Sequence, residues 1–486
     1  MDNPNSSEAL TAALRRATRT IKQLREQSAG QSPGGPIAVV GVGLRLAGGI
    51  TDLDRYWAAL REGRSLITEM PAHRRWPFED EWDFLPTRGS FIDDALDFDP
   101  DFFGLSPRAA QAMDPQHRIL LEVTWEALAH AGLRPDRELP ESVGTFVGIA
   151  GRQDYAAWEP PQVDPHWALG IGNAFAAGRI AYHFGFTGAA TAFDSACSSS
   201  LVAVHHAVAA LRRGESEIAL AGGVSLMLAP GSTAVIQQTG ALAPDGLCKT
   251  FDARANGYVR GEGCAMLVLK RLAAAERDND RVLGVIHGTA VNQDGRSSGF
   301  TAPNAVAQRR VIEAALADAG CKPEEIGMVE AHGTGTSLGD PIEVSAIVAA
   351  LGSRNGGRPL HVGAAKTNVG HLEAAAGVVG LVKALLCIRE RTVPPLAHFQ
   401  TLNPRIDLEG TDVRISGHST DWALAESGPL AGVSSFGAIG TNAHAIVGPA
   451  PETTAAFPPG GDIPRPAWNR GPCVPAFLGA APPARS

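Results

Sequence analysis

One cysteine stands where the sequence changes from a loop to a helix. Cys197 lies in the stretch DSACSSSL, and four apolar residues follow it at helical spacing, Leu201, Val204, Val208 and Leu211. We therefore expect Cys197 at a helix N-terminus, where the positive end of the helix dipole favours a thiolate. A thiolate is a nucleophile, whereas an isolated cysteine is more often an inert buried residue. The residues around Cys197 decide between the two.

Two histidines and a lysine stand in glycine-containing loops further along the chain. His332 lies in EAHGTGTSLGDP, and Lys366 and His371 lie in KTNVGHLEAAAG. A single histidine is more often structural, but two in loops that close a strand or open a helix indicate acid–base chemistry. A fourth stretch, SSFGAIGTNAH, is a glycine-rich turn able to offer backbone N–H groups to a developing oxyanion. The candidate catalytic residues are therefore Cys197, His332 and His371.

A framework of strands and helices must hold these loops. The run IAVVGVGLRLAGG predicts a buried strand, and a second strand-like run, VLGVIHGTAV, begins at Val282. Similar helical units follow them, WEALAHAGLRPDR and EAALADAGCKPEE, each with a further strand behind it. This repeat predicts an internal duplication of an α/β unit, with mainly parallel sheets covered on both faces. We expect one large α/β body with halves at residues 36–281 and 282–448.

The two ends of the chain differ from this body. Residues 1–35 carry apolar residues at the spacing of a coiled-coil seam, followed by the linker-like SAGQSPGGP. We interpret them as a coiled-coil or docking helix and its linker; a surface helix packed on its own domain is the alternative. Residues 449–486 are rich in proline, glycine and alanine, and we interpret them as a tail, ordered by contact or flexible.

Composition limits the compartment and the partners. The chain has 486 residues, of which 44% are hydrophobic and 19% charged, so it can bury a large core. A formal net charge of −9 argues against nucleic acid as a partner. No secretory signal is apparent, and the most apolar stretch, residues 374–388, is too short to span a membrane, so we expect a cytoplasmic protein. Six scattered cysteines without a C-x-x-C pair predict neither a disulfide framework nor a metal site.

The four motifs, in this order, closely resemble the β-ketoacyl synthase (ketosynthase) domains of type I modular polyketide synthases. Three further stretches agree with that family, FFGLSPRAAQAMDPQHR, FDARANGYVRGEG and VNQDGRSSGFTAPN. The resemblance covers about residues 36–448. It implies the thiolase fold, in which two duplicated α/β halves form α-β-α-β-α layers, and it implies a homodimer.

The resemblance also implies a reaction. Cys197 would accept an acyl chain from the phosphopantetheine of an acyl carrier protein, with no other cofactor bound. His332 and His371 would promote decarboxylation of a malonyl-type extender and stabilise the resulting enolate, so that a carbon–carbon bond forms. Neutral imidazoles suit this task because they donate hydrogen bonds without the desolvation cost of a buried charge.

The resemblance assigns supporting roles to further residues. Lys366 would order the histidine loop through its charge. The backbone N–H groups of Cys197 and Ala438 would form the oxyanion hole, and Thr334 and Thr336 match positions that hold the pantetheine arm.

The chain departs from the family in several places. Ser195 replaces the usual threonine and Thr367 the usual serine, which keeps both hydroxyls. SGPLAG lacks the arginines common before Val433, which bears on carrier-protein contact, and GAIG replaces a more usual GVSG in the oxyanion turn. The chain ends near residue 486, where a modular synthase would continue into an acyltransferase, so we interpret it as free-standing or excised. IPRPAWNRG faintly resembles the linker that follows the acyltransferase.

Three alternatives remain open. An atypical stand-alone ketosynthase would cyclise or off-load the Cys197-bound chain intramolecularly, without an extender. A non-catalytic gatekeeper would only bind a carrier protein, although such members typically lose the cysteine or a histidine, and this chain keeps all three. A papain-like protease would use Cys197, His332 and Asn442, whose spacing fits, but the signature around its cysteine is absent and His371 would have no role.

Overall fold

The chain divides into two compact units, Met1–Gly35 and Pro36–Ser486. The computed structural model describes residues 34–135, 139–150, 154–160, 162, 164–352, 358–422, 430–452 and 466–479. The helix expected within residues 1–35 therefore lies outside the described residues, and the description below concerns the second unit.

The first strand is the buried strand that the sequence predicts. β1 (Ile37–Leu46) is buried at all ten positions. Helix α6 (Pro115–His130) begins at Asp114, whose side chain accepts a hydrogen bond from Gln116 N, and packs against β1. A Cβ at Gly41 would overlap the Ala127 carbonyl, so glycine is needed for this close approach of strand and helix.

Five strands form the first half of the sheet in the order β6-β5-β7-β8-β1. Their bounds are β5 (Val143–Ile149), β6 (Ala190–Phe193), β7 (Ile218–Ser225) and β8 (Gly263–Arg271). β5 is parallel to both β6 and β7, whereas β8 is antiparallel to both β7 and β1.

The second half repeats this order as β11-β10-β15-β16-β9, with β13 added at its edge. Its strands are β9 (Gly284–Gln293), β10 (Ile326–Glu330), β11 (Leu360–Gly363), β13 (Val413–Ile415), β15 (Leu430–Phe436) and β16 (Thr441–Gly448). The pairing directions also repeat, because β10 is parallel to its two neighbours while β16 is antiparallel to β15 and β9. The expected duplication is confirmed.

The sheet contains both parallel and antiparallel pairs, and its two halves are continuous. The sequence analysis expected mainly parallel sheets and did not predict the antiparallel pairs or the continuity. β15 and β16 are joined by a turn of only four residues. Because so short a connection reverses the chain, the two strands are antiparallel. At the centre of the sheet, Ile37–Val39 of β1 pair antiparallel with Gly284–Ile286 of β9, which links the two halves into one 11-stranded sheet.

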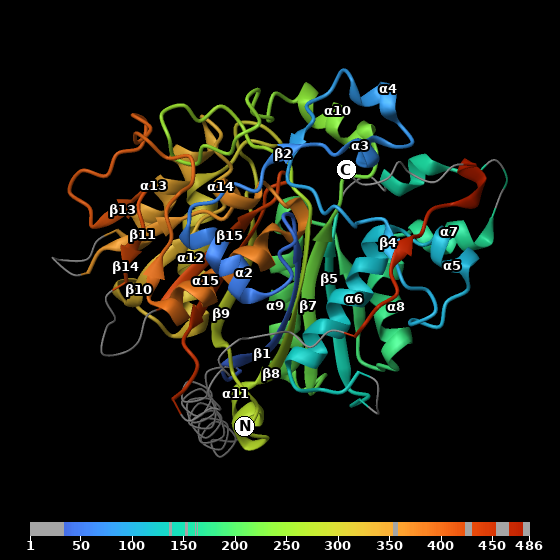
Figure 1. Cartoon of the computed structure of the whole chain (residues 1–486). Coiled ribbons are helices and arrows are strands. Elements are labelled where there is room, and N and C mark those ends of the chain that lie inside the picture. The colour runs from blue at the N-terminus through green and yellow to red at the C-terminus, as the bar shows by residue number, and fades with distance from the viewer. Residues whose placement is uncertain are drawn as a thin grey trace, which may run out of the picture. The chain divides into compact units, whose positions relative to one another are not determined.

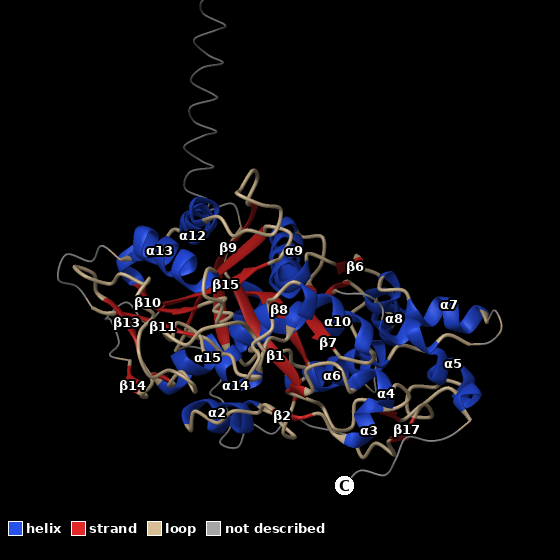
Figure 2. Ribbon diagram, turned by 90° about the horizontal axis from the view of Figure 1, so that it is seen from above, coloured by secondary structure: helices blue, strands red, loops and turns tan. Residues whose placement is uncertain are grey.

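Helices complete the layers (Figures 1 and 2). α9 (Ser199–Arg213) and α15 (Ala376–Glu390) contact each other and strands of both halves, so they form the central helical layer. α6 and α8 (Ala174–Phe184) cover the first half on its other face, and α12 (Ala305–Ala319) and α13 (Gly339–Leu351) lie beside the second half. This α-β-α-β-α arrangement is the expected thiolase fold.

The remaining helices and strands are short. They are α2 (Leu53–Arg61), β2 (Thr68–Glu69), α3 (Ala72–Arg75), α4 (Glu79–Trp82), β3 (Arg88–Gly89), β4 (Asp97–Phe98), α5 (Pro107–Ala112), α7 (Pro165–Ile171), α10 (Pro230–Gln238), α11 (Leu272–Arg277), α14 (Lys366–Val369), β12 (Thr392–Val393), β14 (Thr420–Asp421) and β17 (Gly471–Pro472). Single 3₁₀ turns include η2 (Ala196–Ser198) and η4 (Glu373–Ala375).

The described part of the C-terminal stretch, residues 466–479, packs on the first half. β17 pairs with β4, and Arg470 forms ion pairs with Asp94 and Glu122. The Trp468 ring lies 6.4 Å from that of Trp125 and 6.0 Å from that of Phe102. Contact therefore orders these residues.

Candidate active site

Cys197 lies where the sequence predicts it, between strand β6 and helix α9. It is the central residue of η2, and the helix begins two residues later at Ser199. Ala196 has φ +55, which is uncommon for a residue with a Cβ, and its N–H donates to the Asp194 carboxylate at 3.1 Å. The Cys197 side chain is only partly buried, so a substrate can reach it.

The glycine-rich turn after β15 lies directly over the cysteine. A Cβ at Gly437 would overlap the Ser195 carbonyl oxygen, so only glycine allows this approach. Gly437 brings the next residue, Ala438, to Cys197, and the backbone N–H groups of Ala438 and of Cys197 itself both lower the pKa of the Cys197 thiol. Both N–H groups therefore lie close to the nucleophile.

The Cys197 thiol is not activated in the way its helix position suggests. Burial raises the pKa of Cys197 to about 11, and the nearby Glu373 carboxylate raises it further. Lys366 and the two backbone N–H groups lower the pKa but do not offset burial. This direction is opposite to the thiolate that the helix position predicts, because desolvation raises the pKa more than the nearby positive groups lower it.

His332 follows β10 and is tied to the turn that covers Cys197. Its Nδ1 accepts a hydrogen bond from Phe436 N at 3.3 Å, while the neighbouring Ser435 hydroxyl donates to Cys197 O at 2.8 Å. Two consecutive residues of β15 therefore hold the cysteine and the histidine in register. Since Nδ1 of His332 accepts, its Nε2 carries the proton.

His371 lies between α14 and η4, beside His332. The two rings stand 5.4 Å apart between centroids and nearly perpendicular, and the Tyr258 ring lies 5.0 Å from His371 on another side. Nδ1 of His371 accepts a hydrogen bond from Glu373 N at 3.1 Å, so Nε2 again carries the proton. Each histidine thus keeps one N–H free to donate.

Both histidines are neutral at physiological pH. Burial lowers the pKa of His332 and of His371 well below the usual value, and the positive charge of Lys366 lowers both further. The site therefore presents two neutral imidazole N–H donors, as expected from the sequence.

Lys366 is buried at the start of α14, among acidic residues. Burial lowers the pKa of Lys366, while the carboxylates of Glu330 and Glu343 oppose that change. Glu343 accepts hydrogen bonds from His332 N at 2.6 Å and from Gly333 N at 2.7 Å, and so fixes the histidine loop. Lys366 acts by charge on Cys197 and on both histidines.

Thr334 and Thr336 lie on the loop after His332, both partly buried, with their hydroxyls 3.2 Å apart. Thr336 Oγ1 also accepts from Gly339 N at 3.1 Å. Asp340 holds the same loop by accepting from Gly335 N and, across the site, from Phe251 N.

Several of these supporting residues escaped the sequence analysis. Asp340 lies at the end of the histidine motif EAHGTGTSLGDP and Glu343 follows it, so two acidic residues next to a glycine-rich loop were an available signal. Ser435 and Phe436 lie inside the motif that was noticed, but a strand partner 238 positions away from Cys197 has no local signature. Arg260 and Glu373 were likewise missed.

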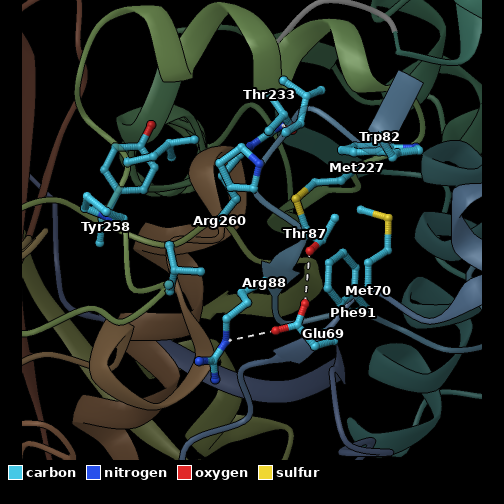
Figure 3. Close-up of a pocket in the computed structure, with 17 residues that line it drawn as sticks. Glu69, Met70, Trp82, Thr87, Arg88, Phe91, Met227, Thr233, Tyr258 and Arg260 are labelled. Atoms are coloured by element: carbon cyan, nitrogen blue, oxygen red, sulfur yellow. Dashed lines mark hydrogen bonds and ion pairs between the residues drawn. The ribbon is translucent and has the colours of Figure 1, made fainter. Parts of the chain in front are cut away.

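Two cavities flank the Arg260–Glu373 ion pair. One, of about 200 Å³, is lined by Ala150, Leu226 and Ile236 as well as by the pair itself. The other, of about 220 Å³, lies between Tyr258, Arg260 and the apolar side chains of Met70, Trp82 and Met227 (Figure 3). Arg260 is a wall of both.

Within the described residues, no helix is long and apolar enough to cross a membrane, and no group of three or more histidine, cysteine or acidic side chains is placed to hold a metal ion.

Comparisons with known proteins agree with this arrangement. Residues 35–275 match the family model "Beta-ketoacyl synthase, N-terminal domain" and residues 283–400 match "Beta-ketoacyl synthase, C-terminal domain". The chain is 46% identical over 468 residues to a phenolphthiocerol/phthiocerol polyketide synthase of Mycobacterium bovis, covering 93% of this chain and 25% of that protein. It is 46% identical over 440 residues to an erythronolide synthase of Saccharopolyspora erythraea, covering 88% of this chain and 12% of that protein.

Solved structures give the same picture. The ketosynthase from module 6 of the bacillaene synthase of Bacillus subtilis superimposes with a TM-score of 0.79 at 38% identity, covering 86% of this chain and 72% of that one. An oxazolomycin ketosynthase domain of Streptomyces albus superimposes with a TM-score of 0.79 at 36% identity, covering 87% of this chain and 77% of that one. The chain thus spans about a quarter or less of the two curated relatives named above.

Proposed function

Because the chain belongs to the β-ketoacyl synthase family, as a ketosynthase of the type I modular polyketide synthase kind, we propose that it joins a carrier-bound acyl chain to a malonyl-type extender. Cys197 is the nucleophile, and His332 and His371 promote the decarboxylation. A papain-like protease is excluded by this family membership. The observation that carries the proposal is that Cys197 and His332 are tied to consecutive residues of β15, while both His332 and His371 accept at Nδ1 and so carry their protons on Nε2.

The first step is transfer of the acyl chain. The Cys197 sulfur attacks the thioester carbonyl of an acyl group on carrier-protein phosphopantetheine, and the carbonyl oxygen becomes an oxyanion. In this proposal the backbone N–H groups of Cys197 and Ala438 stabilise that oxyanion. Burial raises the pKa of Cys197 to about 11, so the thiol gives up its proton to solvent water as it attacks. When the intermediate collapses, the C–S bond to pantetheine breaks and the leaving pantetheine sulfur takes up a proton from solvent, so that one thiol is consumed and one is formed.

The second step forms the carbon–carbon bond. His332 and His371 donate hydrogen bonds to the thioester oxygen of a malonyl-type extender, so the enolate that forms on loss of carbon dioxide is stabilised. The enolate carbon attacks the Cys197-bound carbonyl, and the C–S bond to Cys197 breaks. The Cys197 sulfur leaves with the negative charge that the malonyl carboxylate brought in, and a proton from solvent restores the thiol. Thr334 and Thr336 bind the pantetheine arm of the incoming carrier.

No bound cofactor is needed beyond the pantetheine that carries the substrates, and the protein partners are acyl carrier proteins.

The second copy of the chain pairs along β6. This strand is the outer edge of the 11-stranded sheet, and its first two residues, Ala190 and Thr191, are exposed. An exposed edge is a template for pairing with another strand. Tyr182 on α8, which contacts β6, is 90% exposed and gives an apolar margin to the same face.

Intact-protein mass spectrometry tests the proposal. Incubation with an acyl carrier protein bearing an acyl chain should add one acyl group to the Cys197 peptide, and Cys197→Ala should abolish it. His332→Ala and His371→Ala should still acylate but form no product after malonyl carrier is added, with a loss of about 100- to 10,000-fold. An adduct on Cys248 or Cys264 would disprove the nucleophile, and release of a cyclic product without malonyl donor would favour the intramolecular reaction.

A further inference from the structure

His371 is held by its backbone on both sides through one short segment of chain. His371 N donates to Val259 O at 2.7 Å, and Gly261 N donates to His371 O at 2.9 Å. The residue between these two contacts is Arg260, which forms an isolated bridge with His371. Contacts that hold the segment 259–261 in place therefore also hold the backbone of His371.

Arg260 is fixed by four hydrogen bonds from a buried position. Its side chain is 5% exposed and donates to Ser232 Oγ at 2.9 Å and to Thr233 Oγ1 at 2.6 Å. Its remaining contacts form a two-point ion pair with Glu373, at 2.6 Å from Nε and 3.1 Å from Nη2. Such bidentate pairs have a defined geometry.

Glu373 has the left-handed backbone conformation that favours glycine, with φ +44. A residue with a Cβ adopts this conformation at a cost, so its surroundings must hold it there. In this conformation Glu373 N donates to Nδ1 of His371 at 3.1 Å. The ion pair with Arg260 is the side-chain contact that holds Glu373 in place.

We propose that Arg260 and Glu373 are positioning residues for His371: the ion pair holds Glu373 in its left-handed conformation, and Glu373 N–H then fixes the imidazole with its proton on Nε2. This inference rests on the proposed function. In the proposed reaction, neither the Arg260 nor the Glu373 side chain touches the reacting atoms. Since the hydrogen bond acts on His371 and not on the oxyanion donors, the two residues control extender decarboxylation, and on acyl transfer they act only through the effect of the Glu373 charge on the Cys197 thiol.

A competing role follows from the same geometry. Arg260 lines both cavities that flank the pair, one of which is drawn in Figure 3, so the ion pair could instead serve as a wall that shapes the acyl site. The two roles affect different steps. A lost wall changes acylation and its substrate dependence, whereas a misplaced His371 changes the rate of extender decarboxylation at saturation.

The experiment measures the two half-reactions separately in the full chain. The variants are Arg260→Lys, Arg260→Gln, Glu373→Ala and Glu373→Gly. Acylation of the protein is followed by mass, and decarboxylation of malonyl carrier by carbon dioxide release. We expect acylation rates within about threefold of each other in Glu373→Ala and Glu373→Gly, because both lose the same charge near Cys197. We expect kcat for decarboxylation to fall about 10- to 100-fold in Arg260→Gln and Glu373→Ala, with KM little changed.

Glycine provides the decisive comparison. Glu373→Gly loses the ion pair but adopts positive φ at no cost, so its decarboxylation should exceed that of Glu373→Ala by about tenfold. Arg260→Lys keeps the charge and one contact, and should fall between the unaltered protein and Arg260→Gln. If the ion pair only stabilised the fold, Glu373→Gly would not decarboxylate faster than Glu373→Ala.

Arg45→Lys is the matched control, since Arg45 forms an equally buried pair with Glu122 and Glu126 away from the site. It should lower thermal stability without changing the ratio of the two half-reactions. Parallel loss of acylation and decarboxylation in the Arg260 and Glu373 variants, or equal activity of Glu373→Ala and Glu373→Gly, would overturn the inference. Failure of the unaltered protein to acylate would instead contradict the proposed function itself.

Discussion

At the scale of single residues, the three proposed catalytic side chains are all uncharged in the resting site. The Cys197 thiol is protonated because burial raises its pKa to about 11, and both histidines are neutral because burial and Lys366 lower their pKa values. A neutral thiol beside neutral imidazoles avoids the cost of buried charge until a substrate brings its own carbonyl into the site.

The pH dependence of Cys197 alkylation tests this state. The folded-state pKa lies above that of an ordinary thiol, so the thiolate fraction, and with it the rate of alkylation by iodoacetamide, should rise about tenfold per pH unit from pH 7 toward the pKa. Replacing Lys366 by Met removes a charge that lowers this pKa and should slow the reaction further at each pH. The measurement is adduct mass against time, with Cys197→Ala as background. A rate that is already maximal at pH 7 would show a thiolate and contradict the assignment.

At the scale of elements, the site depends on where strands end. β6, β10, β11 and β15 all lead directly into a loop that carries part of the chemistry, Cys197, His332, Lys366 with His371, and Ala438 respectively. The turn between β15 and β16 depends on a single residue, because only a glycine at position 437 lets the turn approach the nucleophile.

Gly437→Ala should therefore disable the oxyanion donors. The added methyl would overlap Ser195 O and push Ala438 N away from the sulfur, and loss of one oxyanion donor commonly costs about 100- to 1,000-fold. Acylation rates measured by mass should fall by that amount while thermal unfolding shifts little. Gly178→Ala is the control, because a Cβ there meets nothing within 4 Å. Normal acylation in Gly437→Ala would rule out Ala438 as a donor.

At the scale of the whole molecule, distant parts of the chain complete one buried network. Arg470 lies 3.0 Å from Glu122, whose side chain is 0% exposed and also contacts Arg45 at 3.1 Å. Arg118, itself fully buried, donates to the carbonyl of Cys473. Within residues 466–479, Cys473 is part of the core of the first half, and Trp468, Val474 and Leu478 pack against that core.

Ending the chain after Glu452 should destabilise the protein. Removing Arg470 leaves Glu122 with one cationic partner, and breaking a buried pair costs about 3–5 kcal/mol. Urea denaturation should show this loss in the free energy of unfolding, and Arg470→Met alone should reproduce a large part of it. Arg414→Ala, an exposed arginine, serves as the control. Equal stability of the truncated and full chains would mean that these contacts contribute nothing.

The proposed dimer is tested on β6. Thr191→Lys would set like charges against each other where two copies of the edge strand pair, and lysine on an edge opposes such pairing. Analytical ultracentrifugation should show a shift toward monomer, whereas Thr420→Lys on the small β12–β14 sheet should not change the mass. A dimer that persists in Thr191→Lys would place the interface elsewhere.

Local patterns in the sequence predicted those parts that depend on neighbours along the chain. The apolar run of β1, the helix after Cys197 and the duplicated α/β unit follow from periodicity and repeat, and the resemblance of the motifs gave the family. The antiparallel β8 and β16 were missed because pairing direction depends on how the chain returns. The thiol pKa and the Arg260–Glu373 pair, whose members lie 113 positions apart, depend on burial and on contacts that only the folded chain creates.

The repeated strand order has a consequence for the origin of the chemistry. By that order β6 corresponds to β11 and α9 corresponds to α15, so the corner that carries Cys197 and the corner that carries His371 are the same position of the repeated unit. One ancestral corner has thus become two, and after duplication the copies diverged, one toward electron-pair donation and the other toward hydrogen-bond donation. Each half alone holds an incomplete set of reagents, so the reaction needs both halves in one molecule.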